Sequence, residues 1–256
     1  MTEKQVYQNV LIELRKVKSP SLHLEDYNYW GSKGIQEYCN ERYLQFAMSQ
    51  QLSDDLAPLT TSAVFTLPVG TTTTGDWVGS EPDVPVIIGK KYGSDFFRFK
   101  TPNDYWHMLG SHVTSVSKFN YKCYAAGYEE NAPSKRLTQD IANGIINNSF
   151  LKPSIKRPYH SFGDGASSAN VKPDLFYFIG DKSKFGLKEV YIDYLKEPRK
   201  INLTLQQRDL PIDTSAAMEF PEYACNEIIK RIVKLILEVS SDPRQASKPQ
   251  VDLSIP

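Results

Sequence analysis

The stretch 221–239, PEYACNEIIKRIVKLILEV, is the clearest helix of the sequence. It begins with Pro221, whose missing N–H costs nothing at a first helical position, and with Glu222, which the helix dipole favours. Apolar side chains cover about 200° of its surface, and they include Ile228, Ile229, Ile232 and Ile236. Since one supporting surface does not cover so wide an arc, we expect packing on two sides. Its own bundle provides one side, and a neighbouring subunit is a candidate for the other.

Two further helices are expected before residue 59. Thr2-x-x-Gln5 is a capping-box pattern, and apolar residues then recur at helical spacing until Ser19-Pro20 stops the helix. A second helix is expected from about Leu24 to Met48, with one face formed by Tyr27, Trp30, Gly31, Gly34, Ile35, Tyr38 and Cys39. Glycine inside a helix costs about 1 kcal/mol relative to alanine. The central place of Gly31 and Gly34 indicates that they let another helix approach closely; a helix broken between them is the alternative.

The character of the sequence changes from Thr60 to Leu210, where prolines and glycines separate short runs with β propensity. Strands are expected at 62–67, 84–88, 95–100, 112–119 and 175–179, with a short helix at 137–147. Residues 190–195 and 201–206 both alternate with period two around Glu197-Pro198-Arg199, which predicts a hairpin. Two long polar loops, 68–85 and 161–170, interrupt this region and are candidates for contact with partners.

These elements predict an α+β protein in four parts. An N-terminal helical part (1–59) and a C-terminal helix (213–241) form a bundle, around a central, mainly antiparallel β part (60–212). The last part is an extended tail (242–256), in which sparse apolar residues alternate with polar ones. Such a tail does not fold alone, so we expect it to dock on another chain, for example by strand addition. Its candidate docking residues are Arg244, Val251, Leu253 and Ile255.

Composition excludes several classes of protein. The 256 residues carry 30 Lys+Arg and 30 Asp+Glu, and 12% of them are aromatic, which is unlike a disordered chain. A dedicated nucleic-acid binder is disfavoured because it normally shows a basic excess. Residues 150–210 do carry eleven basic and seven acidic residues, which is weak evidence for phosphate contact and otherwise a solvated face. No apolar run is long enough for a membrane span, and three widely spaced cysteines suggest a reducing cytosol.

A search for catalytic or cofactor motifs predicts no enzyme, no cofactor and no metal site. Gly89-Lys90-Lys91 is not a phosphate loop, since Val84 stands where glycine is required and no hydroxyl residue follows. The segment 165–169 lacks the closing glycine of a nucleophile elbow. The spacing of His107 and His112 suits no standard zinc pattern.

Several stretches together resemble proteins of phage necks. The run LEDYNYW (24–30), with 36–43 and LSDDLAPL (52–59), resembles the N-terminal helices of head-to-tail connector proteins. The run FKTPNDYWHML (99–109) resembles an element of tail tubular and neck proteins in which a strand is followed by a turn and a short helix. The runs DYLKEP (193–198) and EFPEYACNEII (219–229) resemble the C-terminal part of ring proteins of crAss-like podoviruses.

The resemblance implies a non-enzymatic virion protein, assembled in the host cytoplasm. Such proteins form a ring, commonly of twelve copies, that docks below the portal protein and supports further neck and tail rings. Double-stranded DNA passes through the ring without sequence readout, and no membrane is involved. By this analogy the tail 244–256 is the arm that docks on the portal or an adjacent ring.

Ring closure requires head-to-tail contacts between two different surfaces of each subunit. Our candidates for the bundle or subunit interface lie on the two apolar helix faces: Tyr27, Gly31, Gly34, Tyr38, Ile228, Ile229, Ile232 and Ile236. The alternative function is a soluble, non-catalytic module that binds another protein through loops 68–85 and 161–170.

Overall fold

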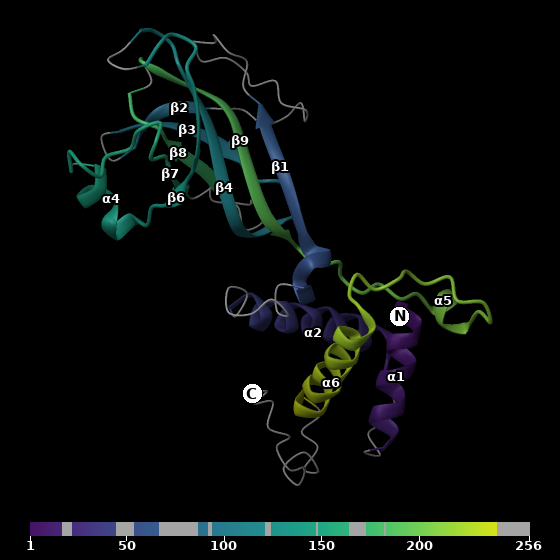
Figure 1. The fold of residues 1–256 in the computed structure, drawn as a ribbon. Helices are drawn as coiled ribbons and strands as arrows, with labels where there is room; N and C mark the ends of the chain where they lie inside the picture. Colours follow the sequence, from purple (N-terminus) through teal and green to yellow (C-terminus); the bar gives the residue numbers. More distant parts are fainter. Residues whose placement is uncertain are drawn as a thin grey trace. The chain divides into compact units, whose positions relative to one another are not determined.

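A computed structural model describes residues 1–16, 22–44, 54–66, 87–91, 94–120, 124–146, 148–163, 173–181 and 183–239. The α+β class is confirmed: helices and antiparallel-rich sheets are both present, and helices lie at both ends of the described chain (Figure 1). The chain divides into two units. The helical unit is Met1–Leu59 with Pro198–Pro256, and the β unit is Thr60–Glu197.

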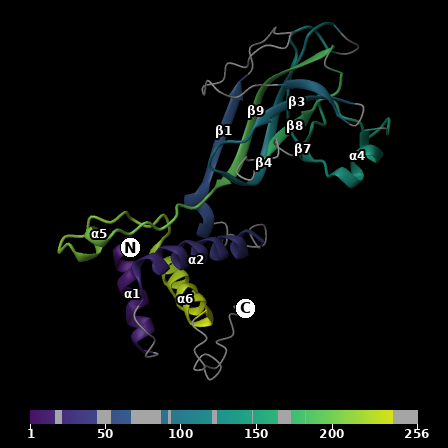
Figure 2. The same cartoon turned by 180° about the vertical axis from the view of Figure 1, so that it is seen from behind.

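The helical unit is built around three helices, α1 (Glu3–Lys16), α2 (Leu24–Leu44) and α6 (Glu222–Val239). A 3-10 turn, η1 (Ala57–Leu59), and a short helix, α5 (Leu205–Asp209), complete it. Helix α6 packs against both α1 and α2, and the three helices lie together in both views (Figures 1 and 2). Their apolar faces form the core of this unit, which includes Val6, Val10, Leu14, Tyr27, Ile35, Tyr38, Ile228, Ile232 and Leu235.

The capping box predicted at the N-terminus is present. The Gln5 backbone N–H donates to Thr2 Oγ1 at 3.3 Å, and the Thr2 backbone N–H donates to Gln5 Oε1 at 3.0 Å. Two orphan donors at the start of α1 are thereby satisfied reciprocally.

Helix α2 runs without interruption through both glycines, so the alternative of a helix broken there is wrong. A Cβ at Gly34 would lie 2.8 Å from Ile232 Cγ1 on α6, and one at Gly31 would lie 2.7 Å from Ile201 Cδ1. Gly34 thus permits the close approach of α6, as expected. Gly31 instead accommodates a segment that is not helical. Residues 45–48, the predicted end of this helix, lie outside the described residues.

The β unit contains two sheets. One has the strand order β1 (Thr60–Thr66), β9 (Phe185–Lys196), β4 (Tyr105–Ser117) and β5 (Glu129–Pro133). The other has the order β2 (Ile87–Lys91), β3 (Ser94–Lys100), β8 (Asp174–Phe178), β7 (Tyr159–Gly163) and β6 (Lys135–Arg136). All described strand pairs are antiparallel except β6 with β7.

Alternate residues of the strands build two apolar layers. One face of β3 and β8 joins the first sheet in the main core, which includes Phe97, Phe99, Leu175, Tyr177, Val113, Val190 and Ile192. The opposite face of the same strands carries Phe96, Phe176 and Phe178, and these pack with α4 (Gln139–Ile146). The period-two alternation of FFRF (96–99) and LFYF (175–178) therefore supplies both layers.

Four predictions about residues 60–212 are wrong. Residues 201–204 are not the second arm of a hairpin, because β9 already has β1 and β4 as neighbours on its two edges. Tyr105–Leu109 is the start of β4 and not a short helix, and the expected loop 161–170 begins inside β7. The change of unit falls between Glu197 and Pro198 and not at 212, since the chain after Pro198 returns to the helices.

Candidate assembly surface

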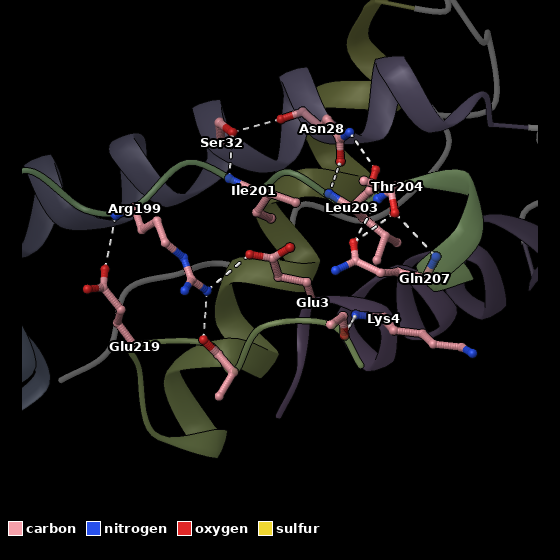
Figure 3. A network of polar contacts seen from close by, with 12 residues as sticks. Glu3, Lys4, Asn28, Ser32, Arg199, Ile201, Leu203, Thr204, Gln207 and Glu219 are labelled. Atoms are coloured by element: carbon pink, nitrogen blue, oxygen red, sulfur yellow. Dashed lines mark hydrogen bonds and ion pairs between the residues drawn. The ribbon is translucent and has the colours of Figure 1, made fainter. Parts of the chain in front are cut away.

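An extended segment, residues 199–204, lies along α2 (Figure 3). The Leu203 backbone N–H donates to Asn28 Oδ1 at 3.1 Å, while Asn28 Nδ2 donates to the Leu203 carbonyl at 3.0 Å. The Ile201 backbone N–H donates to Ser32 Oγ at 3.0 Å, and the Ser32 hydroxyl donates to the Asn28 carbonyl at 2.7 Å. Side chains of α2 thus satisfy backbone groups that a hairpin would have paired with another strand. Ile201 and Leu203 point into the core between these bonds and are buried.

Residues 204–218, which we call the arm, follow this segment. Thr204 caps α5 in a second capping box, with Gln207 N–H donating to Thr204 Oγ1 at 3.3 Å. The far end of the arm returns to the N-terminus, where the Glu3 backbone N–H donates to the Ala216 carbonyl at 3.0 Å and Met218 N–H donates to the Met1 carbonyl at 2.9 Å. Lys4 Nζ donates to the Leu210 carbonyl between these points. The arm is therefore anchored at its start, middle and end.

Arg199 fixes the base of the arm through charged and neutral partners (Figure 3). Its guanidinium Nη2 donates to Glu3 Oε1 at 3.0 Å and to the Ala217 carbonyl at 2.8 Å. Its backbone N–H donates to Glu219 Oε2 at 3.0 Å. Glu3 is almost fully buried, so its pairing with Arg199 compensates a carboxylate removed from water.

The arm exposes large apolar side chains. Leu205 is 59% exposed, Leu210 46% and Ile212 75%, and no residue of α5 is buried. Among its charged residues, Arg208 forms an ion pair with Asp209, and the Asp213 carboxylate accepts hydrogen bonds from Ser215. An anchored segment that presents apolar side chains and little unpaired charge is suited to docking on another protein surface.

A buried polar junction joins α2, the turn before β1 and α6. Asp55, which is 2% exposed, accepts a hydrogen bond from the Tyr223 hydroxyl at 2.7 Å and forms an ion pair with Arg42 Nε at 3.4 Å. Arg42 Nη2 also donates to Glu227 Oε2 at 2.6 Å. Two guanidinium groups contact the ring of Tyr38, that of Arg42 at 5.3 Å and that of Arg231 at 5.7 Å from the ring centre. Asp55 is thus a structural carboxylate of the helical unit.

The predicted interface residues of the two helices are all buried within the chain itself. The set comprises Tyr27, Gly31, Gly34, Tyr38, Ile228, Ile229, Ile232 and Ile236. Helix α6 contacts both α1 and α2, and a contact of its wide apolar face with a neighbouring subunit stays a prediction. The docking residues Arg244, Val251, Leu253 and Ile255, loop 68–85 and residues 164–170 lie outside the described residues.

The sequence reasoning missed the arm, although one signal for it was present. Thr204-x-x-Gln207 repeats the capping pattern of Thr2-x-x-Gln5, and it precedes a helix too short to show an apolar period. The apolar alternation of residues 201–206 is the same whether their backbone N–H and C=O groups bond to another strand or to side chains of a helix.

The β unit contains one pair of side chains that resembles part of a catalytic site. Ser134 Oγ lies 2.8 Å from His160 Nδ1, and His160 is buried against the rings of Phe162 and Tyr177. Burial, together with the nearby charge of Arg136, lowers the pKa of His160 to about 4. A neutral imidazole that is buried beside aromatic rings is suited to structural hydrogen bonding and is a weak general base at neutral pH.

Two further kinds of site are absent from the described residues. No group of three or more His, Cys, Asp or Glu side chains in this part of the chain is placed to hold a metal ion. Among the helices described, none has both the length and the apolar character that crossing a bilayer requires.

No protein-family model matches this chain, and no curated protein matches it significantly. The likeness to phage neck proteins therefore remains a prediction from the sequence.

Proposed function

We propose that this chain is a structural virion protein, a ring subunit of a phage head-to-tail connector. The ring docks below the portal protein, extends the channel for double-stranded DNA and supports the assembly of further neck and tail rings. The protein acts by binding other subunits and not by catalysis. The observation that carries the proposal is the arm, an anchored segment with exposed Leu205, Leu210 and Ile212 that the chain's own core leaves uncovered.

The size of the apolar surface on the arm argues against a stable pair of free subunits. Complete burial of the three side chains would cover roughly 300 Å², whereas a stable pairwise complex buries about 800 Å² on each partner. One arm is therefore too small to hold two free subunits together. In a closed ring each subunit is held by two neighbours and by the portal, and the high local concentration offsets the weakness of each contact.

The sequence stretches that resemble connector proteins also come together in the structure. Arg42, Asp55 and Tyr223 come from three of these stretches and form the buried junction of the helical unit. In the β unit, the Tyr194 hydroxyl donates to Asp104 Oδ1 at 2.9 Å. This bond connects two more of these stretches, 193–198 and 99–109. The stretches that resemble connector proteins therefore contain residues that make contacts between elements. This supports an architecture shared with connector proteins.

Mass measurement by light scattering and native mass spectrometry tests the proposal, on the full chain alone and mixed with the portal protein of the same phage. We expect mostly monomer in dilute solution and a single closed ring when portal is added. Leu205→Ser with Ile212→Ser should weaken ring formation. Phe119→Ser with Phe150→Ser, which changes two exposed rings of the β unit, is the matched control and should not.

The tail is tested in the same assay. Deletion of 244–256 should leave the circular dichroism of the chain unchanged and abolish attachment to the portal. A chain that stays monomeric with portal at all concentrations would contradict the proposed function. Unchanged attachment after the deletion would contradict the docking role of the tail alone.

A further inference from the structure

We infer that the β6–β7 edge of the β unit contacts the phosphate backbone of double-stranded DNA. The inference rests on the proposed function, which places a duplex inside the ring, and it names the surface that meets the duplex. This basic edge consists of five residues: Lys135, Arg136, Lys152, Lys156 and Arg157.

The charge of this region differs from that of the whole chain. Residues 133–162 carry five basic residues and one acidic residue, Asp140, whereas the chain as a whole is neutral. All five basic residues are exposed. Within the described part of the chain, the ion pairs formed by lysine and arginine involve other residues, so that no described carboxylate neutralises the basic edge.

Backbone contacts bring the five residues to one place. The Lys135 backbone N–H donates to the Pro158 carbonyl at 3.0 Å, and β6 pairs with β7 through Lys135 opposite Tyr159. Pro158 directly follows Arg157, whose turn with Ser154 is closed by backbone bonds of 2.9 and 3.2 Å. The Tyr159 hydroxyl donates to the Leu151 carbonyl at 3.0 Å, which places Lys152 beside the same strand.

Neutral groups hold three of these cations. The Arg136 guanidinium lies 5.5 Å from the ring centre of Phe162, and the Lys156 ammonium lies 5.9 Å from that of Tyr124. Arg157 donates to the Phe150 carbonyl. Contacts of this kind position a cation without cancelling its charge, so the groups stay available to an anion.

Carboxylates near the edge do not reverse its charge. Gly180 approaches the Pro153 carbonyl closely, since a Cβ on Gly180 would lie 3.1 Å from that oxygen, and Asp181 follows it. Asp181 is already paired with Lys184 at 3.0 Å. Asp140, the one acidic residue of 133–162, is a single charge in the first turn of α4.

A DNA duplex suits this surface better than an acidic protein because its charge is dense and regular. Duplex DNA carries one phosphate charge per about 1.7 Å of axis, so several cations on a small edge meet phosphates at once. Three of the five residues are lysines, which act as point charges without the bidentate geometry that reads bases or single carboxylates. Contacts of this type are weak and independent of sequence, which permits the duplex to move past the subunit.

Fluorescence anisotropy with a short labelled duplex tests the inference on the full chain over about 50 to 200 mM salt. We expect weak binding that falls steeply as salt rises. Lys152→Gln with Lys156→Gln should reduce the slope of log K against log salt by about 1.8, since each lost phosphate contact removes about 0.9. Both residues lie outside the strands, so the fold should be retained, as circular dichroism will show.

The matched control is Lys100→Gln with Lys200→Gln, which changes the net charge equally at two exposed lysines outside the basic edge and should keep the wild-type slope. Equal slopes for the two double variants, or no binding of the duplex by the wild type, would overturn the inference. A basic edge that binds an acidic protein instead of DNA would give one of these two results. Masses measured on the same preparations separate the two proposals, because rings that form without duplex binding contradict only the DNA contact.

Discussion

A single methyl group added at Gly34 should destabilise the helical unit, although alanine is the better helix former. The Ala Cβ would lie 2.8 Å from Ile232 Cγ1 and 3.6 Å from the Ile232 backbone nitrogen. The contact involves atoms close to the α6 backbone, so rotation of the side chain end does not relieve it. Overpacking in a core costs about 1–3 kcal/mol, and the helix propensity returns about 1 kcal/mol. The expected net loss of unfolding free energy for Gly34→Ala is therefore about 1 kcal/mol.

Two other glycines provide controls for this substitution. A Cβ at Gly31 would meet Ile201 Cδ1, the mobile end of a side chain, so Gly31→Ala should cost less than Gly34→Ala. A Cβ at Gly144 on α4 would have nothing within 4 Å. Gly144→Ala should therefore stabilise the β unit by up to about 1 kcal/mol, the difference in helix propensity.

A double-mutant cycle with Ile232→Ala isolates the contact, because that change removes the atom that Cβ would meet. We expect Gly34→Ala to be less costly in the Ile232→Ala background, with a coupling energy of about 1–2 kcal/mol. Urea unfolding followed by the fluorescence of Trp30, with Trp77 and Trp106 replaced by phenylalanine, reports on the helical unit. A stabilising Gly34→Ala, or a coupling energy near zero, would refute the close approach of α2 and α6.

Two further predictions concern buried polar groups. Tyr223→Phe removes the 2.7 Å hydrogen bond to the buried Asp55 carboxylate. It should lower the unfolding free energy by about 1–2 kcal/mol, as urea unfolding will measure. An unchanged urea midpoint would contradict the role of this bond in the buried junction. His160, whose pKa is lowered from 6.5 to about 4 by burial and by Arg136, stays neutral in the folded state and takes up a proton on unfolding. The unfolding free energy of the β unit should therefore fall by about 3 kcal/mol as the pH falls from 6.5 to about 4. His160→Gln should remove most of this pH dependence. An identical pH profile for the variant would contradict the role of His160.

The sequence predicts α6 and the start of α1 well because the forces that form them are local. The apolar period of 221–239 and the reciprocal bonds of Thr2 and Gln5 depend on residues a few positions apart. Strand β4 was predicted too short because Gly110 and register shifts near Tyr105 and Met108 disturb its alternation. These irregularities are compensated by pairing with β9, which is distant in the sequence.

The course of the chain after Glu197 is not predictable from its own pattern. Alternating residues such as Ile201 and Leu203 indicate an extended backbone. They do not predict which groups form hydrogen bonds with its N–H and C=O groups. The partners are Asn28 and Ser32, far away in the sequence. The same holds for the arm, because the exposure of Leu205 depends on which surfaces the rest of the chain covers.

The central claim is that this chain works as one of several identical subunits around a DNA channel. Cryo-electron microscopy of the intact particle, with symmetry-free reconstruction of the neck, tests it most directly. The account predicts density for this chain in a closed ring below the portal, with each arm against a neighbouring copy and the basic edge towards the duplex. A particle whose neck contains no copy of the chain, or contains it only as a single subunit, would contradict the account.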